Sequence, residues 1–287
     1  IDSCIVRNSS GKAWGGAVGM TGGTLVNSLI CDNKYSGAAN SNAGMGGGVT
    51  VVGGIVSNCV IRNNVIRHSG GGVLLCGPTA HVVDCVITNN SAANNGSGVY
   101  ISRGLIERCR IAGNASGPNG VGIAAGGKVG AYPTEGSAGA CTVRNCIIDR
   151  NMNVNTGAGV YLTTANCTFE NCTIADNVST SAEGGGVYQT AGKLVNCIVV
   201  RNGGSNPTSQ IANDLSRTGG TMQNCLTTEA IPAKGTLTDN EVGDPDFKDA
   251  PGGDYRLSGN SAAIDKGLAV ETFSNDFARV ERPQGEA

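Results

Sequence analysis

The feature that most constrains the fold of this chain is an internal repeat of about 25 residues, built around the sequence N-C-x-I-x-x-N. The repeat cysteine, replaced by serine in the second copy, recurs at residues 4, 28, 59, 85, 109, 146, 172, 197 and 225. Repeats of this length are typical of solenoids, in which each unit buries its apolar side chains only by stacking on its neighbours. The chain is therefore expected to fold as a stack of similar coils.

A glycine-rich element, G-G-G-V or a close variant, precedes most of the repeats. It occurs at residues 15–18, 46–49, 70–73, 96–99, 120–123, 157–160 and 184–187. Neither element has the periodicity of a helix, so each repeat is expected to hold two or three short strands.

Alternation along a strand places the repeat cysteine and the residue two positions later on one face. That face carries Cys, Val, Ile or Leu, and we predict that it points inward. The asparagine five residues after the cysteine is expected at a turn, in the left-handed conformation, with its amide stacked on the next coil.

These patterns predict an all-β fold: a right-handed single-stranded parallel β-helix of about nine coils with an irregular C-terminal segment. A β-propeller needs blades of about 40–50 residues, which the repeat does not provide. We assign residues 1–228 to the coils, with an insertion at about 124–140, and residues 229–287 to a C-terminal capping or pre-anchor segment. This second segment is acidic, with 12 acidic and 6 basic residues, against 10 and 14 in residues 1–228.

Eight of the twelve cysteines occupy the same inward position, so they are predicted to form a ladder of buried thiols. Side chains stacked in register seldom offer the dihedral angle that a disulfide needs. Cys141 and Cys167 form a second short stack. The chain has no C-x-x-C pair, and His68 and His81 lie outside any ligand spacing, which argues against a zinc site.

Composition excludes two further classes of protein. No run of apolar residues approaches the length of a transmembrane helix. The formal net charge is −2 and the sequence pI is about 5.7, with no basic cluster of the kind that binds nucleic acid.

The sequence after the last repeat carries a resemblance to a known family. It reads G-D-P-D-F at 243–247, G-D-Y-R-L at 253–257, S-A-A-I-D-K-G at 261–267 and R-P-Q-G at 282–285. This string resembles the end of bacterial right-handed β-helix repeat proteins of the choice-of-anchor Q type. The repeats themselves are similar to those of polymorphic outer-membrane proteins.

The resemblance implies an exported bacterial protein, secreted or displayed at the cell surface, with a sorting or anchoring region beyond these residues. It implies no reaction. Because the chain starts in mid-repeat, we expect it to be a fragment of a longer protein.

One column of the repeat carries candidate catalytic residues. Four residues after the repeat cysteine stand Arg150, Asp176 and Arg201 on successive coils, with Asp149 beside them. A lyase acting on uronic polysaccharides needs carboxylates that hold Ca²⁺ and a basic side chain that removes a proton. A solvated salt-bridge ladder has the same pattern of alternating charge.

A second outward column is suited to ligand binding. The residue after the glycine-rich element is Tyr100, Ala124, Tyr161 and Tyr188 in successive coils. Tyrosine rings on a rigid surface stack on sugar rings while their hydroxyls stay in water. The alternative is that tyrosine merely suits a half-exposed strand.

A third outward column is apolar and predicts a partner interface. Directly after the repeat cysteine stand Ile5, Leu29, Val60, Val86, Ile147, Ile198 and Leu226, interrupted by Arg110 and Thr173. An exposed apolar surface of this length is expected to be covered. The candidates are a flanking domain, the segment 226–287, or another copy of the chain.

Four carboxylates of the C-terminal segment, Asp244, Asp246, Asp249 and Asp254, are weak candidates for a Ca²⁺ site. They miss the EF-hand spacing, because Lys248 takes the fifth position, and turn formation is the alternative. No other cofactor is expected.

Three functions follow from these patterns. The first is a non-catalytic surface protein, an adhesin or structural stalk, that displays one face for a polysaccharide, a surface protein or self-association. The second is a polysaccharide-active enzyme of the lyase type. The third is a carbohydrate-binding module.

Overall fold

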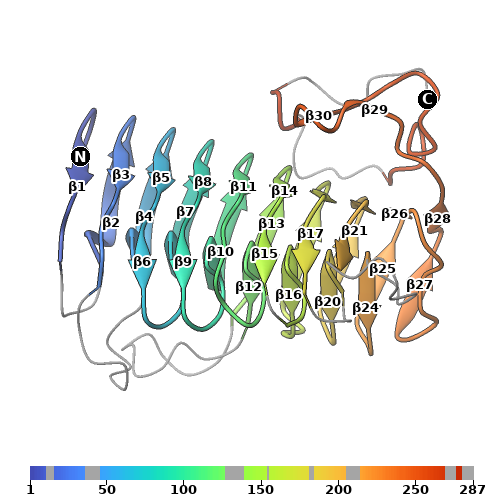
Figure 1. Cartoon of the computed structure of the whole chain (residues 1–287), viewed down its shortest axis with the longest axis horizontal. Helices are drawn as coiled ribbons and strands as arrows, with labels where there is room; N and C mark the ends of the chain where they lie inside the picture. The colour runs from blue at the N-terminus through green and yellow to red at the C-terminus, as the bar shows by residue number, and fades with distance from the viewer. Residues whose placement is uncertain are drawn as a thin grey trace.

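The computed structural model describes residues 1–10, 16–35, 46–126, 139–153, 155–180, 184–204, 214–268 and 276–279. In these ranges every regular element is a β-strand, and the strands stack into a straight rod (Figure 1). The predicted all-β parallel solenoid is confirmed. Among the described residues no helix is long and apolar enough to cross a membrane. The predicted insertion at about 124–140 lies mostly outside the description, since residues 127–138 are not covered.

One face of the rod is a ten-stranded sheet, in which the first nine strands carry the residues directly after the nine repeat positions and the tenth follows Asn240. In spatial order its strands are β1 (Ile5–Arg7), β3 (Leu29–Cys31), β5 (Val60–Arg62), β8 (Val86–Thr88), β11 (Arg110–Ala112), β14 (Ile147–Asp149), β18 (Thr173–Ala175), β22 (Ile198–Val200), β26 (Leu226–Thr227) and β28 (Glu241–Val242). Every neighbouring pair is parallel and in register from coil to coil.

The rest of the wall is a thirteen-stranded sheet. Its first four strands are long and carry register shifts: β2 (Val18–Val26), β4 (Val49–Ser57), β7 (Val73–Val83) and β10 (Val99–Glu107). Beyond β10 the sheet divides into two rows. One row is β12 (Ile123–Ala125), β16 (Val160–Leu162), β20 (Val187–Gln189) and β24 (Leu215–Arg217). The other row is β13 (Cys141–Arg144), β17 (Cys167–Glu170), β21 (Lys193–Val195), β25 (Thr221–Gln223) and β27 (Thr236–Thr238).

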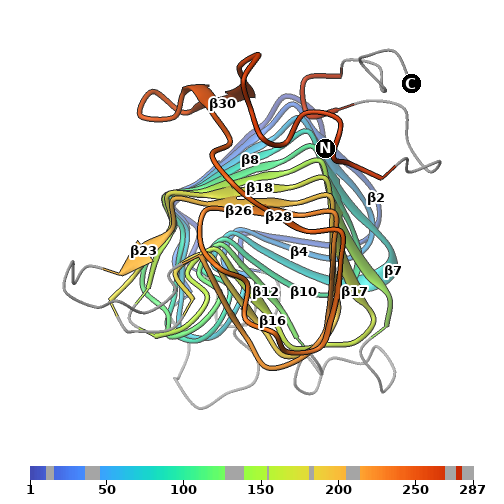
Figure 2. The same cartoon turned by 90° about the vertical axis from the view of Figure 1, so that its right-hand side faces the viewer.

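Short strands complete the coils. β6 (Val65–Ile66) pairs with β9 (Ser91–Ala92), and β15 (Met152–Asn153), β19 (Val178–Ser179) and β23 (Gly203–Gly204) form a third small sheet. An antiparallel hairpin of β29 (Phe247–Asp249) and β30 (Asp254–Leu257) lies outside the rod, as the end-on view of Figure 2 shows. The parallel pairing continues to Val242 through β27 and β28, past the boundary that we assigned at residue 228.

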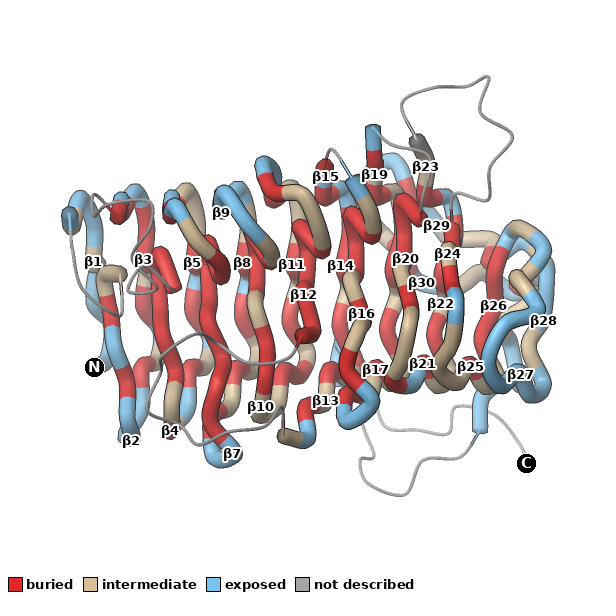
Figure 3. Tube along the Cα trace, turned by 90° about the horizontal axis from the view of Figure 1, so that it is seen from below, coloured by how far each residue is buried: buried red, intermediate tan, exposed pale blue. Residues whose placement is uncertain are grey.

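The inward residues form one continuous core along the whole rod (Figure 3). The repeat cysteine and the residue two positions later point inward as predicted; Cys59 and Ile61, for example, are at most 1% exposed. Seven repeat cysteines are buried free thiols, while Cys4, in the first coil, is exposed. Burial raises the pKa of the Cys146 thiol, which keeps it neutral and inert.

Cys141 and Cys167 depart from this pattern because they form a disulfide. They are in-register partners on β13 and β17, with their Cα atoms 4.5 Å apart. This separation lies within the range that a disulfide spans. The general expectation that stacked cysteines stay unpaired is therefore wrong at this position.

The asparagine five residues after the repeat cysteine is a core residue and not a left-handed turn residue, which corrects our expectation. Asn64, Asn90, Asn114, Asn151 and Asn177 are at most 1% exposed. The left-handed positions stand one residue before and four residues after the cysteine, as at Asn58 and Asn63. The predicted stacking of amides is present, but it runs inside the rod.

From Asn64 to Asn202, each amide oxygen of this inner ladder accepts two hydrogen bonds from the asparagine of the preceding coil. The Asn151 Oδ1 accepts from the backbone N–H and from the Nδ2 of Asn114, both at 3.0 Å. The same geometry repeats at the other rungs, from Asn33 to Asn202. Buried polar groups are thereby satisfied at every step.

The ladder ends on a carboxylate, Asp214, which is 1% exposed. Its Oδ1 accepts from the backbone N–H of Asn202 at 2.8 Å, and its Oδ2 accepts from the Thr228 hydroxyl at 2.5 Å. Burial raises the pKa of Asp214 above its ordinary value, against the effect of these hydrogen bonds.

A carboxyl group with a raised pKa in the folded state stabilises the fold at low pH, and this contribution is lost as the pH rises through that pKa. We expect Asp214→Asn, which keeps an acceptor but has no charge, to lack this loss. Chemical denaturation between pH 4 and pH 7 measures it: the wild type should lose stability relative to the variant as the pH rises. A difference that does not change with pH would contradict the assignment.

Candidate functional site

The predicted catalytic residues lie on the outer face of the ten-stranded sheet, under the C-terminal hairpin. Asp149, at the end of β14, has no exposed surface. The Arg110 guanidinium on β11 binds both of its oxygens, with Nε–Oδ1 3.1 Å and Nη2–Oδ2 2.7 Å. This pairing raises the pKa of Arg110. A bidentate ion pair of this kind is strong and fixes both side chains.

Arg150 joins the sheet to the hairpin. It occupies the left-handed turn position with φ 55°, and its Nη2 donates to the carbonyl oxygens of Ala250 at 2.8 Å and Pro251 at 2.7 Å. Its Nη1 lies 3.7 Å from Asp149. Arg150 is therefore engaged in holding the C-terminal segment.

Tyr255 on β30 completes the contact. Its hydroxyl lies 3.2 Å from the Asp149 Oδ2 and 2.9 Å from the Asp176 Oδ2. Burial and the two carboxylates raise the pKa of this phenol. Asp176 also accepts from the Arg201 Nε at 3.0 Å. The four predicted residues are brought together, but as a docking site for the hairpin.

The predicted tyrosine row lies on the thirteen-stranded sheet, on β10, β16 and β20. The rings of Tyr161 and Tyr188 stack, with centroids 5.2 Å apart and planes within 8° of each other. Each of these two rings therefore covers one face of the other. The sequence analysis expected the flat faces of the tyrosine rings to be open to a ligand. Ala124 separates Tyr100 from this pair.

One face of the stack borders a small side chain. The next residue in register after Tyr188 is Ser216 on β24, the edge strand of this row. Because serine is small, the described neighbour in register adds no third ring to the stack on that side of Tyr188. At the other end Tyr100 is largely covered, and burial raises the pKa of both Tyr100 and Tyr161.

The predicted apolar stripe is divided into a covered and an uncovered half. Ile147 and Ile198 pack against Phe247, Ala250 and Tyr255 of the C-terminal segment, and Leu226 is buried. In the N-terminal coils Ile5 is 66%, Val60 38% and Val86 40% exposed, and Leu29 is half-buried. Figure 1 shows the C-terminal segment above β14 to β28, while β1, β3 and β5 are bare.

A further outward column was missed by the sequence analysis. We name it the outer asparagine column, and it comprises the residue before each repeat position from the second coil on: Asn27, Asn58, Asp84, Arg108, Asn145, Asn171, Asn196 and Asn224. All of these residues are exposed or half-buried except Asn145, which is buried. The Asn196 Oδ1 accepts from the backbone N–H of Leu268 at 2.8 Å, and its Nδ2 donates to the carbonyl of the same residue at 2.8 Å. The Asn224 Nδ2 donates to the Lys266 carbonyl at 3.0 Å. The signal was the first letter of N-C-x-I-x-x-N, to which we had given no role.

The four acidic candidates for Ca²⁺ form turns and local pairs. The Asp244 Oδ1 accepts from the backbone N–H of Asp246 at 2.9 Å, and the Asp249 Oδ1 accepts from that of Gly252 at 3.0 Å. Asp246 pairs with Ser258. Asp254 pairs with Arg256, which lowers the pKa of this carboxyl to about 2. In the described ranges no group of three metal-binding side chains is present.

Comparison with known proteins gives one match. A family model described as a right-handed beta helix region matches residues 1–226. No curated protein and no solved structure matches the chain.

Proposed function

We propose that this chain, which belongs to the right-handed β-helix family, is a non-catalytic rod of an exported bacterial surface protein and binds a glycan at the Tyr161–Tyr188 stack. The family's fold is shared by adhesin-like, structural and polysaccharide-cleaving proteins. The fold alone therefore does not distinguish these functions, and the proposal rests on the geometry of the candidate sites. Export is supported by the resemblance of the sequence at 243–267 to proteins of the choice-of-anchor Q type.

The observation that carries the proposal is the orientation of Tyr188. Its ring is held by the Tyr161 ring on one side and faces the position of Ser216 on the other. The C–H face of a sugar ring packs on such an aromatic face, and the tyrosine hydroxyls remain available for hydrogen bonds. Because the paired strands β16 and β20 fix the two rings, the platform needs no rearrangement to bind.

The lyase hypothesis gains no support from the contacts of its residues. A lyase needs carboxylates that face a substrate cleft. Asp149 is fully buried, and the Tyr255 hydroxyl bridges it to Asp176. A polysaccharide would have to displace the hairpin before it could reach them.

A glycan array followed by titration calorimetry tests the proposal with two substitutions of opposite kind. Tyr188→Ala removes the platform, whereas Ser216→Tyr extends the ring stack and caps the open face. Each should lower the affinity for the glycan about tenfold, since one aromatic contact contributes about 1.4 kcal/mol.

Arg256→Ala is the matched control, because this side chain is exposed on the hairpin and should leave the affinity unchanged. An array on which the wild type binds no glycan would contradict the proposal. So would a bound glycan whose affinity neither Tyr188→Ala nor Ser216→Tyr lowers.

A further inference from the structure

The outer asparagine column and the apolar stripe run side by side along the rod. Their residues flank each repeat cysteine, as the exposed Asn58 and Val60 flank the buried Cys59. Together they make one outer surface that is repeated from coil to coil.

In the C-terminal half this surface binds polypeptide through both columns. The stripe residues Ile147 and Ile198 pack under Phe247 and Tyr255. The column residues Asn196 and Asn224 bond the backbone of residues 266–268. These amides contact main-chain groups, which every sequence carries, so the column fits an extended peptide of almost any sequence.

Described contacts of the segment reach back as far as Asp84. There the Arg279 Nη2 lies 2.9 Å from the Asp84 Oδ2, and the Arg108 Nε lies 2.8 Å from its Oδ1. Asp84 and Arg108 interrupt the asparagine column. The hydrogen bonds and ion pairs of the described part of the segment do not extend to the coils before Asp84.

The N-terminal half presents the same two columns uncovered. Val60 is 38% and Val86 40% exposed, and Asn27 and Asn58 are exposed as well. The Asn58 Nδ2 donates to the Asn27 Oδ1 at 2.8 Å, which uses one of its two N–H groups. The surface is thus continuous with one that already holds polypeptide.

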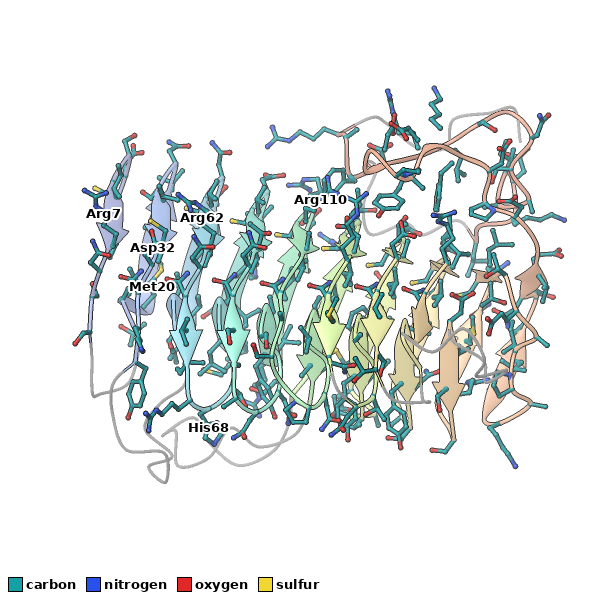
Figure 4. All side chains as sticks on the ribbon, viewed as in Figure 1. Arg7, Met20, Asp32, Arg62, His68 and Arg110 are labelled. Atoms are coloured by element: carbon teal, nitrogen blue, oxygen red, sulfur yellow. A yellow bond between two sulfur atoms is a disulfide. The ribbon has the colours of Figure 1, made fainter. Side chains whose placement is uncertain are left out.

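The charge beside the stripe differs between the two halves. In the covered half the position two residues after the stripe residue is Asp149, which contacts the hairpin. In the N-terminal coils the same position is Arg7 or Arg62. Figure 4 shows both on the coils at the N-terminal end, with Asp32 nearby, and Arg110 at the edge of the C-terminal segment. In the covered half Asp149 accepts the Tyr255 hydroxyl at this position. In the uncovered half Arg7 and Arg62, which also interact with Asp32, carry guanidinium groups that pair with carboxylates.

We propose that the uncovered half is a docking surface for an extended, acidic segment of a partner protein. The segment runs along the rod with its backbone on Asn27 and Asn58, its apolar side chains on Val60 and Val86, and its carboxylates at Arg7 and Arg62. The occupant is a different protein and not a second copy, because the segment of this chain with matching chemistry is already bound to its own rod. The site is on a different sheet from the tyrosine stack and does not depend on the glycan proposal.

The probe is a synthetic peptide of residues 243–268, which carries the aromatic, acidic and backbone groups that contact the covered half. Fluorescence anisotropy of the labelled peptide against the whole protein should show saturable binding. Val60→Asp and Arg62→Glu should each weaken it at least tenfold, and a scrambled peptide should bind no better than these variants do.

Met152→Asp is the matched control, because Met152 is 53% exposed on another face and receives the same change from apolar to acidic. It should bind the peptide as the wild type does, and circular dichroism confirms that all variants fold. Absence of saturable binding, or equal loss in Met152→Asp and Val60→Asp, would overturn the proposal. A wild-type dimer that Val60→Asp dissociates, without peptide binding, would also overturn it and assign the surface to contacts between copies.

Discussion

Replacing Asn151 by alanine is expected to lower the free energy of unfolding by about 2–6 kcal/mol, because it leaves two buried donors without acceptors at about 1–3 kcal/mol each. The donors are the backbone N–H and the Nδ2 of Asn114, which both bond the Asn151 Oδ1 at 3.0 Å. Asn114 has no exposed surface, so both donors are buried. Urea denaturation followed by circular dichroism measures the loss.

A second asparagine provides the control for this experiment. Asn58 is exposed, and its amide bonds only one described neighbour, Asn27. Asn58→Gly keeps the left-handed backbone conformation available and should cost well under 1 kcal/mol, as surface substitutions usually do. A loss in Asn151→Ala as small as that in Asn58→Gly would show that the inner ladder is not a main source of stability.

Replacing Gly122 by alanine is expected to destabilise the rod by about 3 kcal/mol or more, at or above the upper end of the usual cost of overpacking. A Cβ atom at this position would lie 2.5 Å from the Gly159 carbonyl oxygen and 2.9 Å from the Asn151 Nδ2. Both groups belong to the next coil, so the backbones of two coils must separate to admit one methyl group. We expect a large drop in melting temperature and in the yield of soluble protein.

Gly22 provides a control position at which the same substitution should not lower the stability. No atom lies within 4 Å of a Cβ placed there, so Gly22→Ala should leave stability unchanged or raise it by about 0.4–1 kcal/mol through the unfolded chain. If Gly122→Ala were as stable as Gly22→Ala, the close approach of the coils at the glycine-rich element would not limit the fold.

Periodicity was sufficient to predict the coils, because the same few inward residues must recur wherever one coil buries the next. It was not sufficient to place the asparagines. Asparagine favours left-handed turns, and we assigned this role to residues such as Asn64. In the structure the coil geometry imposes the left-handed conformation at other positions, where Arg150 and Arg201 also adopt it, and Asn64 is left to fill the core.

The apolar stripe was visible in the sequence, but its cover was not. The contacts that cover it join residues about 100 positions apart, as between Arg150 and Ala250 or between Asp149 and Tyr255, and no local pattern encodes them. The orientation of the tyrosine rings could not be predicted from the sequence for a related reason. Whether Tyr188 shows a face depends on its neighbours in register, Tyr161 and Ser216, which lie 27 and 28 residues away in the chain.

The inner asparagine ladder makes the coils interchangeable. Each rung offers the same acceptor to the coil before it and the same donors to the coil after it. If one whole repeat were removed, Asn64 would meet Asn114 in place of Asn90, and every hydrogen bond of the ladder would find an identical partner. The length of such a rod is therefore free to change by recombination between repeats, since coils can be gained or lost without redesigning the core.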